Sequence, residues 1–329
     1  MPRPVPSIAS PAPAGLPGRL WQASPPLTAF SALMFVAAAL SLVGLVVDPR
    51  VITGAPAWLK PFKFAVSTGI YSITLAWIFL SLPHAPRVRR VVGWTTAIVL
   101  LLEVVIIAFQ AWRGTSSHFN VATTLDQILF AAMGIAIMTQ TVVSVSVAVA
   151  LWRHRFSDRP LGWALRLGMT LTIFGALTGA LMTTPTAAQL ADARAGAPMI
   201  VSGAHTVGAP DGGPGLPVTG WSREHGDVRV PHFVGLHAIQ ALALLAVGLR
   251  RWRRPESVRT RAVLVGAASY AALFGLLTWE ALRGHSVLAP DATAVTAFAT
   301  WGALTLLASG WIGLSARRVP NHTLDGRTA

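Results

Sequence analysis

Residues 91–111 read VVGWTTAIVLLLEVVIIAFQA, an almost entirely apolar stretch in which Glu103 is the one charged side chain. A helix of about 20 apolar residues is long enough to cross a hydrocarbon core of roughly 30 Å. In lipid every backbone N–H and C=O group must find its partner inside the segment. The stretch is therefore predicted to be a transmembrane helix.

Similar stretches recur along the whole chain of 329 residues. Only 12% of the residues are charged, whereas an average soluble domain contains about 25%. We predict an all-α polytopic integral membrane protein with eight transmembrane helices. These helices are expected at residues 27–47, 62–82, 91–111, 127–151, 161–183, 232–249, 262–282 and 292–315.

The positive charge of the chain indicates its orientation in the membrane. A net charge of +14 suggests nucleic-acid binding in a soluble protein, but here the basic residues flank the predicted helices. With the N-terminus inside, 18 Lys and Arg residues fall on the inner side and 8 on the outer side. We therefore predict a multi-pass protein of the plasma (inner) membrane with both termini in the cytoplasm. Its predicted partner is the lipid bilayer rather than nucleic acid.

The segments between and beyond the helices differ in character. Residues 1–26 are rich in Pro and Ala and are predicted to form a disordered cytoplasmic tail, and residues 316–329 form a second tail. Helices 1–5 occupy residues 27–183, and helices 6–8 occupy residues 232–315. The outer connection at residues 184–231 is long and rich in Gly and Pro, so it is either disordered or a functional, lid-like loop.

Two parts of the chain share a short motif at an offset of 170 residues. Residues 110–114 read QAWRG and residues 280–284 read EALRG, while Pro61 and Pro231 stand at the starts of two predicted helices. An offset of this kind predicts two four-helix halves in parallel orientation, although chance recurrence of common residues is the alternative interpretation.

Six of the nine histidines fall on the predicted outer side. His118, His232 and His237 are predicted to bind a transition metal or haem, with His205 or His285 as further ligands. In a straight helix starting at Pro231, His237 lies roughly 9 Å inward, and it shares a face with Gln240. His232 lies on a different face, so one metal reaches both only if the first turn is distorted. The alternatives are structural histidines or proton carriers.

An acid and an amide inside the apolar stretches suggest proton handling. Glu103 is predicted to lie about 15 Å inward of Arg113, and ionisable residues at that depth are functional candidates. We predict that Glu103 and Gln110 relay protons inward, and we include Glu280 among the candidate catalytic residues. The alternative is a protonated Glu103 that bonds Gln140 and serves structure alone.

Four basic residues at outer helix ends are candidates for anion binding. Lys60, Lys63, Arg113 and Arg283 are predicted to bind an anionic substrate, either a lipid head group or a small anion. The alternative is that they anchor the helices at the interface. The absence of cysteine excludes disulfides and thiolate metal sites. The motifs of common soluble enzymes, including the phosphate-binding P-loop, G-x-S-x-G and H-E-x-x-H, are also absent.

Two motifs resemble a known group of sequences. Residues 58–64 (WLKPFKF) and 232–240 (HFVGLHAIQ), together with Arg113-Gly114 and residues 117–120 (SHFN), resemble a group of uncharacterised bacterial multi-spanning membrane proteins. The resemblance covers the chain from the first to the last predicted helix and implies a similar fold. It implies no activity and no catalytic residue.

Three functions fit these features. The leading hypothesis is a membrane enzyme with an outward-facing metal or haem site that acts at the outer leaflet, in redox or hydrolytic chemistry. The second is a proton- or ion-coupled transporter that uses Glu103. The third is a structural or assembly partner in the membrane.

Overall fold

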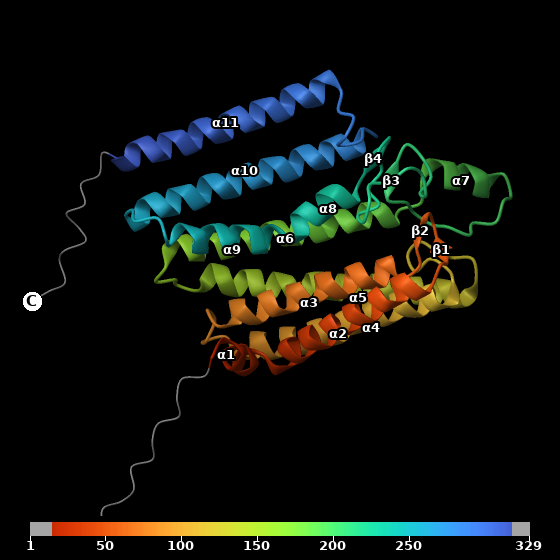
Figure 1. Ribbon diagram of the computed structural model, residues 1–329, viewed down its shortest axis with the longest axis horizontal. Helices are drawn as coiled ribbons and strands as arrows, with labels where there is room; N and C mark the ends of the chain where they lie inside the picture. The colour runs from red at the N-terminus through yellow and green to blue at the C-terminus, as the bar shows by residue number, and fades with distance from the viewer. Residues whose placement is uncertain (1–14, 318–329) are drawn as a thin grey trace, which may run out of the picture.

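The computed structural model describes residues 15–317, and these form a bundle of long helices (Figure 1). The predicted tail at residues 316–329 begins in the last turn of α11, and its residues 318–329 lie outside the described residues, as do residues 1–14. The helices are α1 (Leu16–Ala23), α2 (Pro25–Val47), α3 (Leu59–Phe79), α4 (Pro86–Arg113), α5 (Thr124–Arg153), α6 (Arg159–Thr183), α7 (Ala187–Arg194), α8 (Arg229–Leu236), α9 (Ala238–Leu249), α10 (Glu256–Leu282) and α11 (Ala292–Arg317). The strands are β1 (Val51–Ile52), β2 (Ala55–Pro56), β3 (Thr206–Val207) and β4 (Gly226–Asp227).

The all-α prediction is confirmed, and so is the prediction of membrane-spanning helices. Among the described residues, seven helices are long and apolar enough to cross a membrane. An eighth span is obtained when α8 and α9, which meet at an angle of 44°, are counted together. The outermost helix, α11, exposes Leu306, Leu307 and Trp311 by at least 70% each, as expected for side chains that face lipid.

The long helices lie side by side, and their connections gather at two ends. We call the end that carries residues 114–123 and 184–228 the loop end. Helix α1 and the last turn of α11 lie at the opposite end (Figure 1). Residues 16–23 of the predicted N-terminal tail are helical, because α1 packs its buried Leu20 and Ala23 into the main hydrophobic core.

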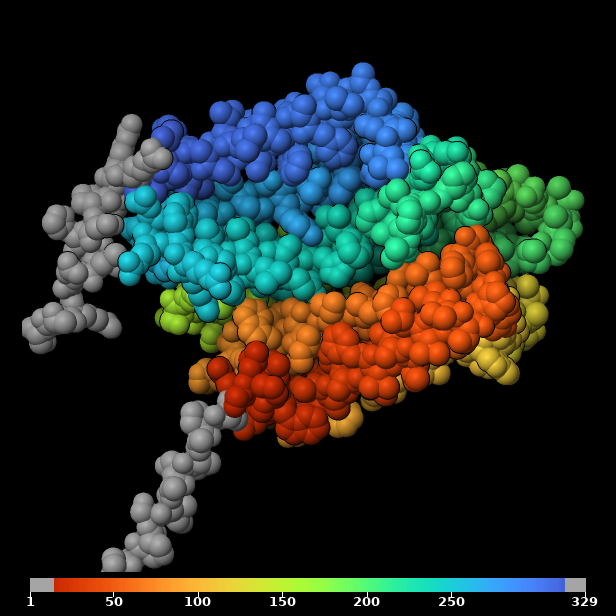
Figure 2. Space-filling model, in the orientation of Figure 1, coloured from red at the N-terminus to blue at the C-terminus, as the bar shows by residue number. Residues whose placement is uncertain are grey.

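The long connection contains secondary structure of its own. Helix α7 starts with a capping box, in which the Thr186 side chain and Gln189 satisfy each other's backbone N–H groups. Strands β3 and β4 form an antiparallel pair. In the space-filling view this connection, in green, lies against the β1–β2 hairpin, in orange (Figure 2). Lys63 fixes the connection to α3 by donating to the carbonyl oxygens of Val218 and Thr219, at 3.2 and 3.1 Å.

The main core joins α3, α5, α6 and α9. Phe79, Leu151, Leu165 and Ile239 are almost completely buried in it. The helices α6 and α8 approach backbone to backbone through a glycine pair, because a Cβ atom on Gly175 would stand 2.3 Å from the carbonyl carbon of Gly235. Small residues permit this close approach of helices within a membrane.

The sixth predicted helix is broken rather than straight. His237 ends α8 and precedes α9, so it lies at the bend and not one turn down a regular helix. The Thr172 hydroxyl on α6 accepts from the Ile239 N–H at 3.2 Å and donates to the Leu236 carbonyl at 3.3 Å. Tyr270 on α10 donates to the Val234 carbonyl at 2.6 Å. Neighbouring helices thereby satisfy backbone groups at the break, as hydrocarbon surroundings demand.

We expect Gly175→Ala to destabilise the protein, because the added methyl group meets backbone atoms that cannot rotate away. The expected cost is about 1–3 kcal/mol, the usual range for overpacking, seen as a lower melting temperature in detergent. Gly134→Ala on α5 is the matched control, because a Cβ atom there meets nothing within 4 Å. Equal melting temperatures for the two variants would contradict the close contact between α6 and α8.

Candidate functional site

Three predicted ligand histidines come together at the loop end, each from a different segment. His118 lies in the turn after α4, His205 lies in the long connection just before β3, and His232 lies on α8. In each ring the Nδ1 atom already has a partner. These partners are the Ser117 hydroxyl at 3.1 Å, an Asp211 carboxylate oxygen at 2.6 Å and the Gly175 carbonyl oxygen at 2.7 Å.

The turn after α4 directs His118 inward. Helix α4 ends at Gly114, whose φ of 77° is in the left-handed region that closes helices. Phe119 also has a positive φ, 64°, although it carries a side chain. A non-glycine residue in this conformation is strained and is held by its surroundings. Phe119 is buried and lies against the His205 ring at 4.8 Å, so the strained residue links the two histidine segments.

His205 is held by a carboxylate in the same connection. Asp211 accepts from the backbone N–H groups of His205 and Thr206 as well as from the His205 ring. Burial raises the pKa of Asp211, but these hydrogen bonds outweigh it and hold the pKa well below its ordinary value. Asp211 is therefore ionised at neutral pH and fixes the tautomer of His205 with a proton on Nδ1.

Lys60, His205 and His232 all influence the ionisation of His118. Burial is the main cause that holds the pKa of His118 well below its ordinary value, and the charge of Lys60 is the next cause. The nearby rings of His205 and His232 act in the same direction. Burial likewise lowers the pKa of His205, despite the opposing hydrogen bond with Asp211. His118 and His205 are thus neutral at pH 7 and have a lone pair to offer a ligand.

In the described residues, no hydrogen bond involves the Nε2 atoms of these three histidines. Their ring nitrogens do not all lie within 4.8 Å of one another, so closing them round one ion requires movement of the rings or the connection. The His237 ring packs on Phe233, with 4.2 Å between the ring centroids. A straight helix would put His237 and His232 on different faces, and the break between α8 and α9 changes that relation.

Glu103 lies deeper in the bundle than the histidines. It is 2% exposed, and its Oε2 atom has no hydrogen-bond partner among the described residues. The charges of Glu103 on α4 and Lys60 on α3 interact, although they form no ion pair within 4.0 Å. Gln140 does not bond Glu103, and its amide donates instead to Tyr71 and Ser144, at 3.3 Å each.

Two further predicted residues belong to a structural cluster at the loop end. Gln110 donates to Asp126 at 2.8 Å, and Arg113 contacts both Gln110 and Asp126, at 2.5 and 2.6 Å. Thr123 donates to the second oxygen of Asp126 at 2.6 Å. Gln110 therefore joins α4 to the start of α5 rather than continuing a path from Glu103. Glu280 and Arg283 occupy a second cluster, at the loop end of α10.

Sequence reasoning missed the groups that orient the histidines. The Gly175 carbonyl belongs to a backbone whose position only packing decides, and Asp211 is one of several acids in the connection. The available signal was the position of Asp211 six residues after His205, within a run of glycines and prolines that favours tight turns.

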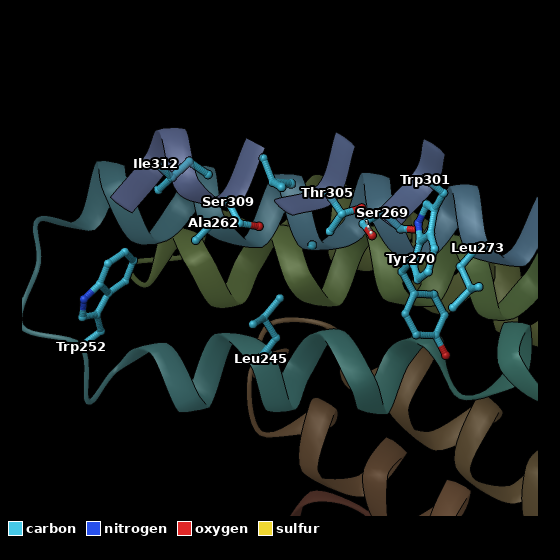
Figure 3. A pocket seen from close by; sticks show the side chains of 12 residues that line it. Leu245, Trp252, Ala262, Ser269, Tyr270, Leu273, Trp301, Thr305, Ser309 and Ile312 are labelled. Carbon is cyan, nitrogen blue, oxygen red and sulfur yellow. Dashed lines mark hydrogen bonds between the residues drawn. The ribbon is translucent and has the colours of Figure 1, made fainter. Parts of the chain in front are cut away.

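A separate hollow of about 360 Å³ lies between α9, α10 and α11 (Figure 3). Its lining is mainly apolar and includes Leu245, Tyr270 and Trp301. None of the predicted site residues lines this hollow, so it is distinct from the histidine cluster.

Comparison of the chain with protein-family models, with curated proteins and with solved structures gives no match.

We expect Asp211→Asn to loosen the connection between α7 and β4. The variant removes the negative charge that three groups share, and charge-assisted hydrogen bonds are about twice as strong as neutral ones. The expected result is severalfold faster proteolytic cleavage within residues 196–228, measured by limited proteolysis at pH 7. Asp192→Asn, at an exposed acid on α7, is the control and should be cleaved at the original rate. Unchanged cleavage of the Asp211 variant would show that this carboxylate does not hold the connection.

Proposed function

We propose that this chain is an integral membrane protein that binds a transition-metal ion with His118, His205 and His232 and acts there as a membrane enzyme. The observation that carries the proposal is the arrangement of the three rings. In each ring Nδ1 is engaged by a carbonyl, a carboxylate or a hydroxyl, which leaves Nε2 for a ligand. Histidines that bind metals ordinarily have their other nitrogen held in this way.

The donor set favours an ion over haem. Three neutral imidazoles suit zinc, copper or iron, and catalytic zinc sites commonly use three protein ligands and keep the fourth position open. Haem takes its axial ligands from at most two residues. The positive charge of Lys60 beside the cluster favours an anionic substrate, either a lipid head group or a small anion.

We further propose that the loop end faces the outside of the cell. The connections at the opposite end carry clusters of arginine, among them Arg87, Arg89 and Arg90, and the positive-inside rule assigns such connections to the cytoplasm. This orientation places both termini in the cytoplasm of a plasma-membrane protein and the histidines on the outer side.

We also propose that the bundle consists of two four-helix halves of parallel orientation, α2–α5 and α6–α11. The helix boundaries support this proposal, because α3 shifted by 170 residues covers 229–249, the range of α8 and α9 together. The same shift carries α4 to 256–283, which matches α10 to within one residue. Successive helices also pack in the same order, α2 on α3, α3 on α4 and α4 on α5, and then α6 on α8 and α9, these on α10, and α10 on α11.

Elemental analysis of the purified protein tests the metal site. We expect the content of zinc, copper or iron to fall by about one equivalent per chain in the His118→Ala, His205→Ala and His232→Ala variants. Asp211→Asn should weaken metal binding by about 10–100-fold, because it removes an outer-shell partner of a ligand. His237→Ala is the matched control and should keep the metal.

Metal content that is independent of all three histidines would contradict the proposal. Gel filtration of the His118→Ala variant is the control for folding. A monodisperse peak shows that the variant lost its metal and not its fold.

A second candidate function is proton-coupled transport, and the deep acid favours it. Four buried polar side chains on α3, α4 and α5 each have an atom without a partner among the described residues, namely Ser72, Thr96, Glu103 and Gln140. Buried polar atoms are normally satisfied by protein or by internal water. Such a series is typical of a hydrated proton path.

If Glu103 carries protons, Glu103→Gln should abolish proton entry into liposomes while leaving the protein folded, because the amide cannot exchange a proton. A pH-sensitive dye inside the liposomes measures the flux. Glu224→Gln, at an exposed acid of the long connection, is the control and should retain the flux. Proton entry at the original rate in the Glu103 variant would remove the transport function.

A further inference from the structure

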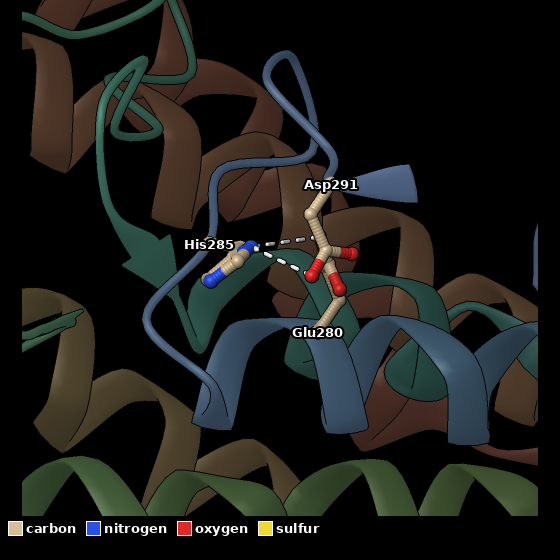
Figure 4. A group of neighbouring side chains, drawn as sticks. All are labelled: Glu280, His285 and Asp291. Carbon is tan, nitrogen blue, oxygen red and sulfur yellow. Dashed lines mark ion pairs between the residues drawn. The ribbon is translucent and has the colours of Figure 1, made fainter. Parts of the chain in front are cut away.

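Three potential metal ligands meet at the loop end of α10, apart from the three histidines described above (Figure 4). They are Glu280 in the last turn of α10, His285 in the turn that follows, and Asp291 just before α11. Among residues 15–317 this is the one group of three such side chains whose ligand atoms all lie within 4.8 Å of one another. The His285 Nδ1 atom is 3.9 Å from a Glu280 oxygen and 3.9 Å from an Asp291 oxygen.

Glu280 points an unused oxygen into this group. The residue is completely buried, and its Oε2 atom is 3.3 Å from Arg283. Its Oε1 atom has no hydrogen-bond partner among the described residues, because the His285 ring at 3.9 Å is too distant to donate to it. A buried carboxylate oxygen without a partner is costly, so this one is explained best by a ligand.

The corresponding end of α4 provides an internal reference. Both helices end at a glycine with positive φ, Gly114 at 77° and Gly284 at 80°, and both place an arginine immediately before it. In each turn the arginine pairs with an aspartate near the start of the next helix, Asp126 or Asp291. The two ends are therefore built on the same plan.

The two ends differ in the groups that a cation needs. The amide of Gln110 on α4 corresponds to the carboxylate of Glu280 on α10. In the turns that follow these helices, Thr115 corresponds to His285. In the α4 cluster one arginine balances one carboxylate, and Gln110 bonds to both. In the α10 cluster one arginine faces two carboxylates, so one negative charge is left over, and an imidazole stands beside it.

We propose that Glu280, His285 and Asp291 form a site for a divalent cation such as Zn²⁺ or Mn²⁺, with one nitrogen and two carboxylate ligands. Two atoms bound to the same zinc at about 2.1 Å lie roughly 3.4 Å apart in tetrahedral geometry. The observed spacing of 3.9 Å therefore needs only a small contraction. His285 and Asp291 are partly exposed, which gives the ion a way in, and Arg283 balances the second carboxylate.

A cation at this place joins three segments. Glu280 belongs to α10, Asp291 precedes α11, and the backbone of His285 forms a bridge with that of His225 in the long connection. Binding is expected to hold the long connection and α11 against α10. The inference depends on none of the three histidines of the first site.

Titration of Mn²⁺ into the detergent-purified His118→Ala variant, followed by electron paramagnetic resonance, tests this inference alone. We expect one Mn²⁺ per chain, and competition by Zn²⁺. Glu280→Gln and His285→Thr restore the residue types of the α4 end, and each should weaken Mn²⁺ binding at least about tenfold. Glu224→Gln is the control for the loss of one acid near the site.

Equal Mn²⁺ affinity of the His118→Ala protein with and without Glu280→Gln or His285→Thr would overturn the proposal, and so would the absence of saturable Mn²⁺ binding. His285→Thr changes a partly exposed side chain, so it keeps the test decisive if the buried Glu280 variant does not fold. The His118→Ala background removes a ligand of the three-histidine site. A negative result in this titration therefore counts only against the Glu280 site, and a negative result in the elemental analysis of the histidine variants counts only against the three-histidine site.

Discussion

A backbone group inside a hydrocarbon layer must find its partner within the protein, and the break between α8 and α9 shows how much of this structure depends on that constraint. The break frees groups around His237, and the hydroxyls of Thr172 and Tyr270 satisfy them from two neighbouring helices. The Thr172 contacts come from α6, which approaches α8 closely through Gly175 and Gly235. The helix break, the glycine pair and the two hydroxyls therefore form one unit.

The same unit positions the candidate site. The close approach of α6 puts the Gly175 carbonyl 2.7 Å from the His232 ring and so fixes which nitrogen faces the cluster. The strained Phe119 lies next to His118 in the turn after α4, and the Asp211 carboxylate orients the His205 ring in the long connection. In the proposed site helix α8 supplies His232, the turn after α4 supplies His118, and the long connection supplies His205. An arrangement of this kind suits a site that admits a ligand from one side of the membrane.

The ends of α4 and α10 share most of their polar contacts and differ at two positions. Both use an αL glycine, an arginine and an aspartate to join successive helices. At α4 a neutral amide completes the network, and its polar groups bond to one another. At α10 an acid replaces the amide and leaves an oxygen of Glu280 without a partner. Carboxylate oxygens and an imidazole nitrogen are ligands that divalent cations such as Mn²⁺ and Zn²⁺ accept, which is the basis of the proposed second site.

The sequence by itself determined the helical class, the approximate spans and the gathering of histidines at one end, because apolar length and charge asymmetry are local properties of the chain. It also identified His118, His205 and His232 as candidates. Only the tertiary structure decided that His237 lies at a bend, that Gln110 bonds Asp126 and not Glu103, and that Lys63 holds the long connection. These outcomes depend on which helices pack together and on which backbone carbonyls they present, and contacts between segments more than a hundred residues apart leave no local signal in a single sequence.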